Sequence, residues 1–123
     1  TVLDVAHNPA SAATLVRFLK SRDIPGRTRV VLGMLADKDI AAFTDTLAAV
    51  TDDWYLATPG GERGLSARTL DGVIDSQGIR KHARQFTSVG DALWKAEAEA
   101  VAGDRIVVCG SFITVAEALA SHV

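Results

Sequence analysis

Short apolar runs alternate with segments of helical periodicity along the whole sequence, and this alternation constrains the fold more than any other feature. The strand-like runs are Thr1–Val5, Arg29–Leu35, Trp54–Ala57, a short run at Phe86, and Ile106–Cys109. Several of them are apolar at consecutive positions, as is typical of strands buried on both faces. We therefore predict an α/β domain with a mostly parallel sheet that is covered on both sides by helices.

The first helix has the clearest start signal. Apolar residues recur at helical spacing within Pro9–Arg22, and Asn8 before Pro9 combines an N-cap with a proline in the first turn. The other helices are predicted over Ile40–Val50, from a cap at Ser66 through Ile74, over Ala92–Ala102 after a capping box of Ser88 and Asp91, and around Val115, Ala116 and Leu119.

Composition excludes several classes of protein. The 123 residues suit one domain, and a hydrophobic fraction of 48% provides a core without disulfides or metals. A net charge of −2 gives no sign of a nucleic-acid or anionic-membrane partner, and no apolar run reaches the ~18 residues of a membrane span. The single cysteine fits a reducing cytoplasm. We expect no metal site, because the spacing of His7, His82, His122 and Cys109 matches no ligand pattern.

Four chemically unusual segments follow predicted strands. They are residues 4–9, 33–39, 58–64 and 110–114. Right-handed crossovers place all strand-to-helix loops at one edge of a parallel sheet, where open α/β sheets bind their ligands. We therefore expect these segments to converge on one rim. The glycines of 58–64 resemble a phosphate loop only superficially, because neither a Walker A motif nor a dinucleotide-binding motif is present.

Asp4 and His7 are the densest pair of candidate residues. A carboxylate at a strand end can accept hydrogen bonds from two ribose hydroxyls, and an imidazole three residues later can contact a phosphate. The alternative interpretation is a polar loop with an N-cap at Asn8, and the spacing alone does not choose between the two.

Two further segments allow both a ligand-binding and a structural interpretation. Asp37 and Lys38 precede a predicted helix, where they are either ligand contacts or solvated charges, and Asp39 is interpreted as an N-cap. Ser111 after Gly110 presents a hydroxyl and free N–H groups that suit a carboxylate or phosphate, or is a plain N-cap.

Three ordered motifs resemble one family. Leu3–Pro9, Gly33–Asp39 and Cys109–Ala116 are similar to motifs in the C-terminal domain of bacterial dihydrofolate synthase/folylpolyglutamate synthases, which belong to the Mur ligase superfamily. The resemblance implies a Rossmann-like, mostly parallel sheet of about five to six strands with helices on both faces. It also implies that residues 1–123 form a single domain, the C-terminal domain of a larger ligase whose N-terminal ATPase domain is absent.

The resemblance further implies a chemistry. ATP phosphorylates a carboxylate of dihydropteroate or a folate, and the amine of L-glutamate then attacks the acyl phosphate. Asp4 and Asn8 are expected to bind ATP, His7 to lie near the phosphates and the glutamate as the catalytic candidate, and Ser111 to bind glutamate, with Asp37 and Lys38 as further candidates. The Mg2+ ligands are expected in the absent N-terminal domain, so the isolated chain should be inactive.

Two alternatives stay open at this point. One is the corresponding domain of a Mur-type cell-wall amino-acid ligase. The other is a stand-alone nucleotide-binding or interaction module that has kept the ligase fold.

Overall fold

Five strands form one parallel sheet. The computed structural model describes residues 1–36 and 39–121. The strands are β1 (Val2–Leu3), β2 (Thr28–Leu32), β3 (Asp53–Ala57), β4 (Ala83–Phe86) and β5 (Arg105–Cys109), in the spatial order β1-β5-β2-β3-β4. Every neighbouring pair is parallel, which confirms the predicted α/β class.

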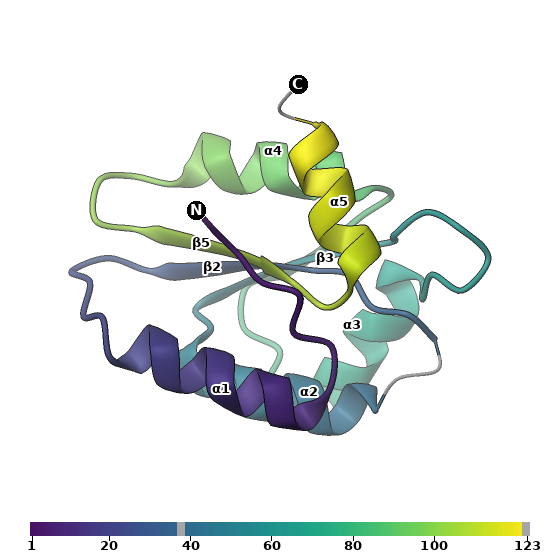
Figure 1. The fold of residues 1–123 in the computed structure, drawn as a ribbon, viewed down its shortest axis with the longest axis horizontal. Helices are drawn as coiled ribbons and strands as arrows, with labels where there is room; N and C mark the ends of the chain where they lie inside the picture. Colours follow the sequence, from purple (N-terminus) through teal and green to yellow (C-terminus); the bar gives the residue numbers. More distant parts are fainter. Residues whose placement is uncertain (37–38, 122–123) are drawn as a thin grey trace.

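Helices cover both faces of this sheet (Figure 1). One face carries α1 (Pro9–Lys20), α2 (Ile40–Leu47) with a 3-10 turn (Ala48–Val50), and α3 (Ala67–Ser76), and the other carries α4 (Val89–Glu99) and α5 (Phe112–Ala120). Alternate residues of each central strand serve the two cores. In β3, Trp54 packs into the core under α1 to α3, whereas Tyr55 packs into the core under α4 and α5. This two-sided burial explains why the strands have continuous apolar sequences.

Local capping determines where the helices begin. Asn8 Oδ1 accepts a hydrogen bond from the Ser11 N–H at 2.9 Å, Ser11 Oγ accepts from the Asn8 N–H at 3.2 Å, and Pro9 opens α1 as predicted. Ser66, Ser88 and Ser111 accept equivalent bonds at the starts of α3, α4 and α5. All three act on N–H groups that the first turn leaves without a helical partner.

Several predicted boundaries are wrong, and the first predicted strand, Thr1–Val5, is confined to Val2–Leu3. The prediction for α4 was Ala92–Ala102, but the helix spans Val89–Glu99, because Ser88 caps it directly and Asp91 already lies in the first turn. The second predicted strand, Arg29–Leu35, ends at Leu32. Leu35 instead forms an antiparallel bridge with Gly64 in the loop after β3.

Candidate functional site

Three loops meet at the carboxyl ends of β1, β5 and β2. The Gly110 N–H donates to the Ala6 carbonyl at 3.0 Å, and the Gly33 N–H donates to the Cys109 carbonyl at 3.3 Å. Thr114, in the first turn of α5, donates through Oγ1 to the Gly33 carbonyl at 2.8 Å. Segments that are far apart in the sequence therefore form one connected rim, as the sequence predicted.

Gly110 allows the closest approach in this rim. Its φ is +117°, and a Cβ atom at this position would overlap the Gly33 carbonyl oxygen. Only glycine adopts such a backbone conformation without strain and leaves this space open. The close crossing of the β5 and β2 loops therefore depends on this residue.

Asp4 lies half-buried at the end of β1. Its N–H donates to the Val108 carbonyl at 3.0 Å, and its Oδ1 accepts from the Ala6 N–H at 2.7 Å. These two bonds hold the carboxylate at the rim. Within residues 1–36 and 39–121, no hydrogen bond uses the second carboxylate oxygen, Oδ2, so it remains available as an acceptor.

His7 has a defined ring orientation. Its Nδ1 lies 2.9 Å from the Val5 carbonyl oxygen, and a carbonyl only accepts, so Nδ1 carries a proton. The Asn8 amide nitrogen lies 3.5 Å from Nε2, which can act as an acceptor in the tautomer that carries its proton on Nδ1. The ring also packs against Phe112, with centroids 6.0 Å apart and planes tilted by 40°.

A small pocket adjoins this imidazole. It has a volume of about 130 Å³ and is lined by His7, Leu35, Ser111, Phe112 and Ile113. Phe112 is 66% exposed, so an apolar surface borders the polar groups of the rim. The pocket brings two predicted site residues, His7 and Ser111, to one place.

Ser111 and Asn8 both serve as helix caps. The Ser111 side chain is buried, and its Oγ accepts from the Thr114 N–H at 3.0 Å and lies 2.8 Å from Thr114 Oγ1. The cap interpretation is therefore confirmed for both residues. Their predicted contacts with glutamate and ATP remain predictions, as does the predicted ribose contact of Asp4.

The structure describes only part of the segment 33–39. Asp37 and Lys38, the further candidates, lie outside the described residues. Asp39 caps α2 as expected, because its Oδ1 accepts from the Ala42 N–H at 3.3 Å.

Sequence reasoning did not identify how the loop 58–64 is held. The Ala36 N–H donates to the Arg63 carbonyl at 2.8 Å, and the Leu65 N–H donates to the Met34 carbonyl at 2.8 Å. At the other end of the loop, Glu117 of α5 accepts from the Gly60 N–H. No spacing in the sequence pointed to Glu117, because its partner lies 57 residues away.

The chain carries no grouped metal ligands in its described part. Among residues 1–36 and 39–121, no three His, Cys, Asp or Glu side chains gather as a metal site would require. Cys109 is buried, and burial raises the pKa of its thiol, so it is a core residue rather than a ligand or nucleophile. None of the described helices is long and apolar enough to cross a membrane.

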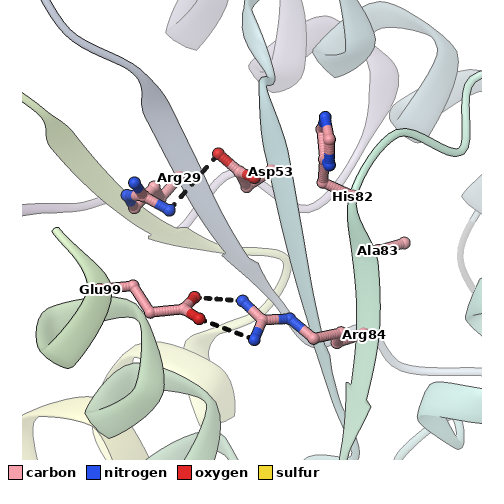
Figure 2. A pocket seen from close by; sticks show the side chains of 6 residues that line it. All are labelled: Arg29, Asp53, His82, Ala83, Arg84 and Glu99. Carbon is pink, nitrogen blue, oxygen red and sulfur yellow. Dashed lines mark hydrogen bonds and ion pairs between the residues drawn. The ribbon is translucent and has the colours of Figure 1, made fainter.

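A larger hollow lies at the opposite, amino edge of the sheet (Figure 2). It measures about 470 Å³ and is lined by Arg29, Asp53, His82, Ala83, Arg84 and Glu99. Its charges already pair with one another: Arg84 makes a two-pronged ion pair with Glu99, and Arg29 lies 3.5 Å from Asp53. An incoming ligand would have to compete with these pairs, so we assign this region to stability.

Comparison with known proteins identifies the family of this chain. Residues 1–112 match the model of the family described as "Mur ligase, glutamate ligase domain". The dihydrofolate synthase/folylpolyglutamate synthase of Escherichia coli (strain K12) is 42% identical over 118 residues, which cover 96% of this chain and 26% of that relative.

Solved structures agree with this match. A bifunctional folylpolyglutamate synthase/dihydrofolate synthase from Yersinia pestis, complexed with AMPPNP and a Mn ion, superposes with a TM-score of 0.88 at 44% identity, over 98% of this chain and 28% of that one. A structure of such an enzyme with Mn, AMPPNP and L-glutamate bound has a TM-score of 0.86 at 43% identity, over 98% of this chain and 29% of that one. The chain thus spans about a quarter of the length of the relatives it matches.

Proposed function

The chain belongs to the glutamate ligase domain family of the Mur ligases, and on this premise we propose that it is the C-terminal domain of an ATP-dependent ligase that adds L-glutamate to dihydropteroate, to folates, or to both. The observation that carries the proposal is the single rim formed by Asp4, His7 and Ser111 at the carboxyl ends of neighbouring strands. The relatives of known structure with a bound nucleotide, and in one case L-glutamate, support it.

The proposed reaction has two steps. A carboxylate oxygen of the pterin substrate attacks the γ-phosphorus of ATP, which releases ADP and leaves an acyl phosphate. The amine nitrogen of L-glutamate then attacks the acyl carbon, phosphate departs, and the nitrogen loses a proton as the amide forms. In such transfers a protein mainly positions the groups and offsets their charge.

In this scheme Asp4 binds the ribose and His7 lies between the phosphates and the amino acid. The second Asp4 oxygen can accept from a ribose hydroxyl, because Oδ1 is already bonded to the Ala6 N–H. With its proton on Nδ1, the His7 ring can accept through Nε2 from the ammonium group of the incoming glutamate. Ser111 contributes mainly by starting α5, whose first N–H groups suit a carboxylate. Asn8, and Asp37 and Lys38, are secondary candidates.

The remaining machinery belongs elsewhere in the proposed enzyme. This sequence has no phosphate-loop motif, and its described residues do not form a metal site. We propose that the Mg2+ that accompanies ATP is bound by an N-terminal domain that closes over this rim. We expect the isolated chain to be inactive. We also propose that the complete enzyme is cytoplasmic, because it uses ATP and folates.

The test uses the full-length ligase that contains this domain. Asp4→Ala should raise the KM for ATP about tenfold or more, while the KM for the pterin substrate changes less than about twofold, because one ribose hydrogen bond to a charged group contributes about 1.5–3 kcal/mol. Asp23→Ala, which removes an exposed carboxylate in the turn after α1, serves as the control. Unchanged KM values for both substrates in Asp4→Ala would remove the ribose assignment.

A substrate panel on the same enzyme tests the choice of family branch. We expect amide formation with dihydropteroate or a folate. A preference for a nucleotide-linked muramyl substrate would overturn the proposal in favour of a cell-wall ligase. Amide formation by the isolated 123-residue chain would contradict the proposed need for a second domain.

A further inference from the structure

One face of α5 contacts the site through residues at a constant spacing of three. Ser111 caps the helix, Thr114 holds the Gly33 carbonyl, and Glu117 binds the loop 58–64. Side chains three apart lie on the same side of a helix, so these three form a short ladder along it. The first two act on the loops after β5 and β2, and Glu117 extends the ladder to the loop after β3.

Glu117 contacts this loop at one backbone N–H group, that of Gly60. Its two carboxylate oxygens accept from the Gly60 N–H at 3.1 and 3.2 Å. A hydrogen bond from a backbone N–H to a charged carboxylate is stronger than one between neutral groups. A Cβ atom at Gly60 would lie only 2.7 Å from Glu117 Oε2, so the carboxylate occupies the space that glycine leaves.

The loop is held at its other end as well. Gly64 bridges to Leu35, and the Arg63 carbonyl accepts from Ala36. Residues 61–63 therefore project between two attachment points, one on α5 and one on the loop after β2. Figure 1 shows this loop extending from the end of β3 before the chain enters α3.

We infer that Glu117 is a positioning residue that holds the loop 58–64 against the amino-acid side of the site, an inference that rests on the proposed function. The order of strands carries the argument. Along the rim the proposed ribose contact Asp4 follows β1, Ser111 follows the adjacent β5, and the loop 58–64 follows β3, two strands further on. This loop therefore lies on the side of Ser111 that faces away from Asp4. Displacement of this loop should therefore raise the KM for L-glutamate more than the KM for ATP.

Two variants remove the contact from opposite sides. Glu117→Ala deletes the acceptor, whereas Gly60→Ala pushes the carboxylate away with a methyl group. Gly60 does not have a positive φ, so alanine there adds no left-handed strain. Glu117→Gln keeps the side-chain length and one oxygen acceptor, and should restore most of the contact. Leu119→Ala, at an exposed position of the same helix, is the matched control.

Steady-state kinetics of the full-length ligase, combined with hydrogen exchange of the same proteins, test the inference. Glu117→Ala and Gly60→Ala should each raise the KM for L-glutamate about fivefold or more, with the KM for ATP within about twofold of wild type. The KM of Glu117→Gln for L-glutamate should lie within about threefold of the wild-type value. Leu119→Ala should have the wild-type KM. The Gly60 amide should exchange about tenfold faster in Glu117→Ala.

The outcomes separate the inference from the proposed function. If the wild-type ligase uses L-glutamate but its KM is unchanged in Glu117→Ala, the inference is overturned and the proposed function stands. Unchanged exchange at Gly60 in Glu117→Ala also overturns it, because the loop is then held without Glu117. A wild-type enzyme that does not use L-glutamate overturns the proposed function itself, and the inference with it.

Discussion

The hydroxyl of Tyr55 donates to Oε1 of Glu99 at 2.6 Å, and this bond joins the centre of the sheet to the end of α4. Arg29 donates to the same hydroxyl oxygen at 2.9 Å, and Arg84 lies over the Tyr55 ring. Arg84 also pairs with Glu99 (Figure 2). The network lies at the amino edge of the strands, opposite the candidate site. The paired charges of this network are therefore separate from the polar groups of the candidate site.

This network predicts that the free energy of unfolding depends on pH in the acidic range. The Arg84 hydrogen bonds, which outweigh the cost of burial, lower the pKa of Glu99 from its ordinary 4.5 to about 2. Because the pKa is lower in the folded state, the contribution of Glu99 is present above about pH 4.5 and is lost as the pH falls towards 2. Glu99→Gln should therefore flatten the fall in unfolding free energy between these pH values.

Urea unfolding at neutral and at acidic pH measures this effect. At neutral pH the Glu99→Gln chain should be less stable by only about 1 kcal/mol, because the pair with Arg84 is partly exposed. Asp23→Asn, an exposed control, should keep the wild-type slope. A Glu99→Gln chain with the full wild-type acid sensitivity would show that other groups cause it.

Gly110→Ala should disrupt the rim. The substitution combines the strain of a positive φ with an overlap on the Gly33 carbonyl, so we expect a loss of about 1–3 kcal/mol or more of unfolding free energy. Gly72→Ala is the matched control, because Gly72 lies within α3 with open space around it and should gain about 0.5–1 kcal/mol. Equal unfolding free energies of the two variants in chemical denaturation would contradict the interpretation.

Asn8→Ala should weaken the start of α1. Loss of the capping bond to the Ser11 N–H is expected to cost about 1 kcal/mol, whereas Asn8→Asp keeps an acceptor and should cost less. Thermal and chemical unfolding of the two variants test this ranking. If Asn8→Asp is as unstable as Asn8→Ala, the cap does not account for the role of this residue in the fold.

Cys109 should be inert in the folded chain. The side chain is fully buried and burial raises the pKa of its thiol, so the thiolate that reacts with alkylating reagents is scarcely formed. A thiol-reactive dye should label the chain only after denaturation, at one equivalent per chain. Labelling of the native chain at the denatured rate would show that β5 opens in solution.

Much of the architecture was predictable because it depends on local signals. The Asn8–Pro9 start of α1 and the caps at Ser66 and Ser111 involve bonds to residues only three positions away, so a short stretch of sequence contains both partners. The alternation of apolar runs and helical periodicity likewise predicted the parallel sheet. The ordered motifs pointed to the rim that the structure forms from them.

Where long-range contacts decide an outcome, the sequence predictions failed or were silent. Leu35 looked like a strand residue because it is apolar, yet it leaves the sheet to pair with Gly64. Glu117 was not among the candidate residues, because its contact with Gly60 depends on where the loop after β3 lies.

The sequence by itself determined the α/β class, the start of α1 at Pro9, the caps at Ser66 and Ser111, and the identity of the polar residues after the strands, because these follow from spacing within single elements. Only the tertiary structure decided which of those residues meet. Ser111 is buried as a cap, Asp4 accepts through Oδ1 from the Ala6 N–H, and Glu117 contacts a loop residue 57 positions away. Such contacts depend on the order of strands in the sheet, which no local stretch of chain encodes.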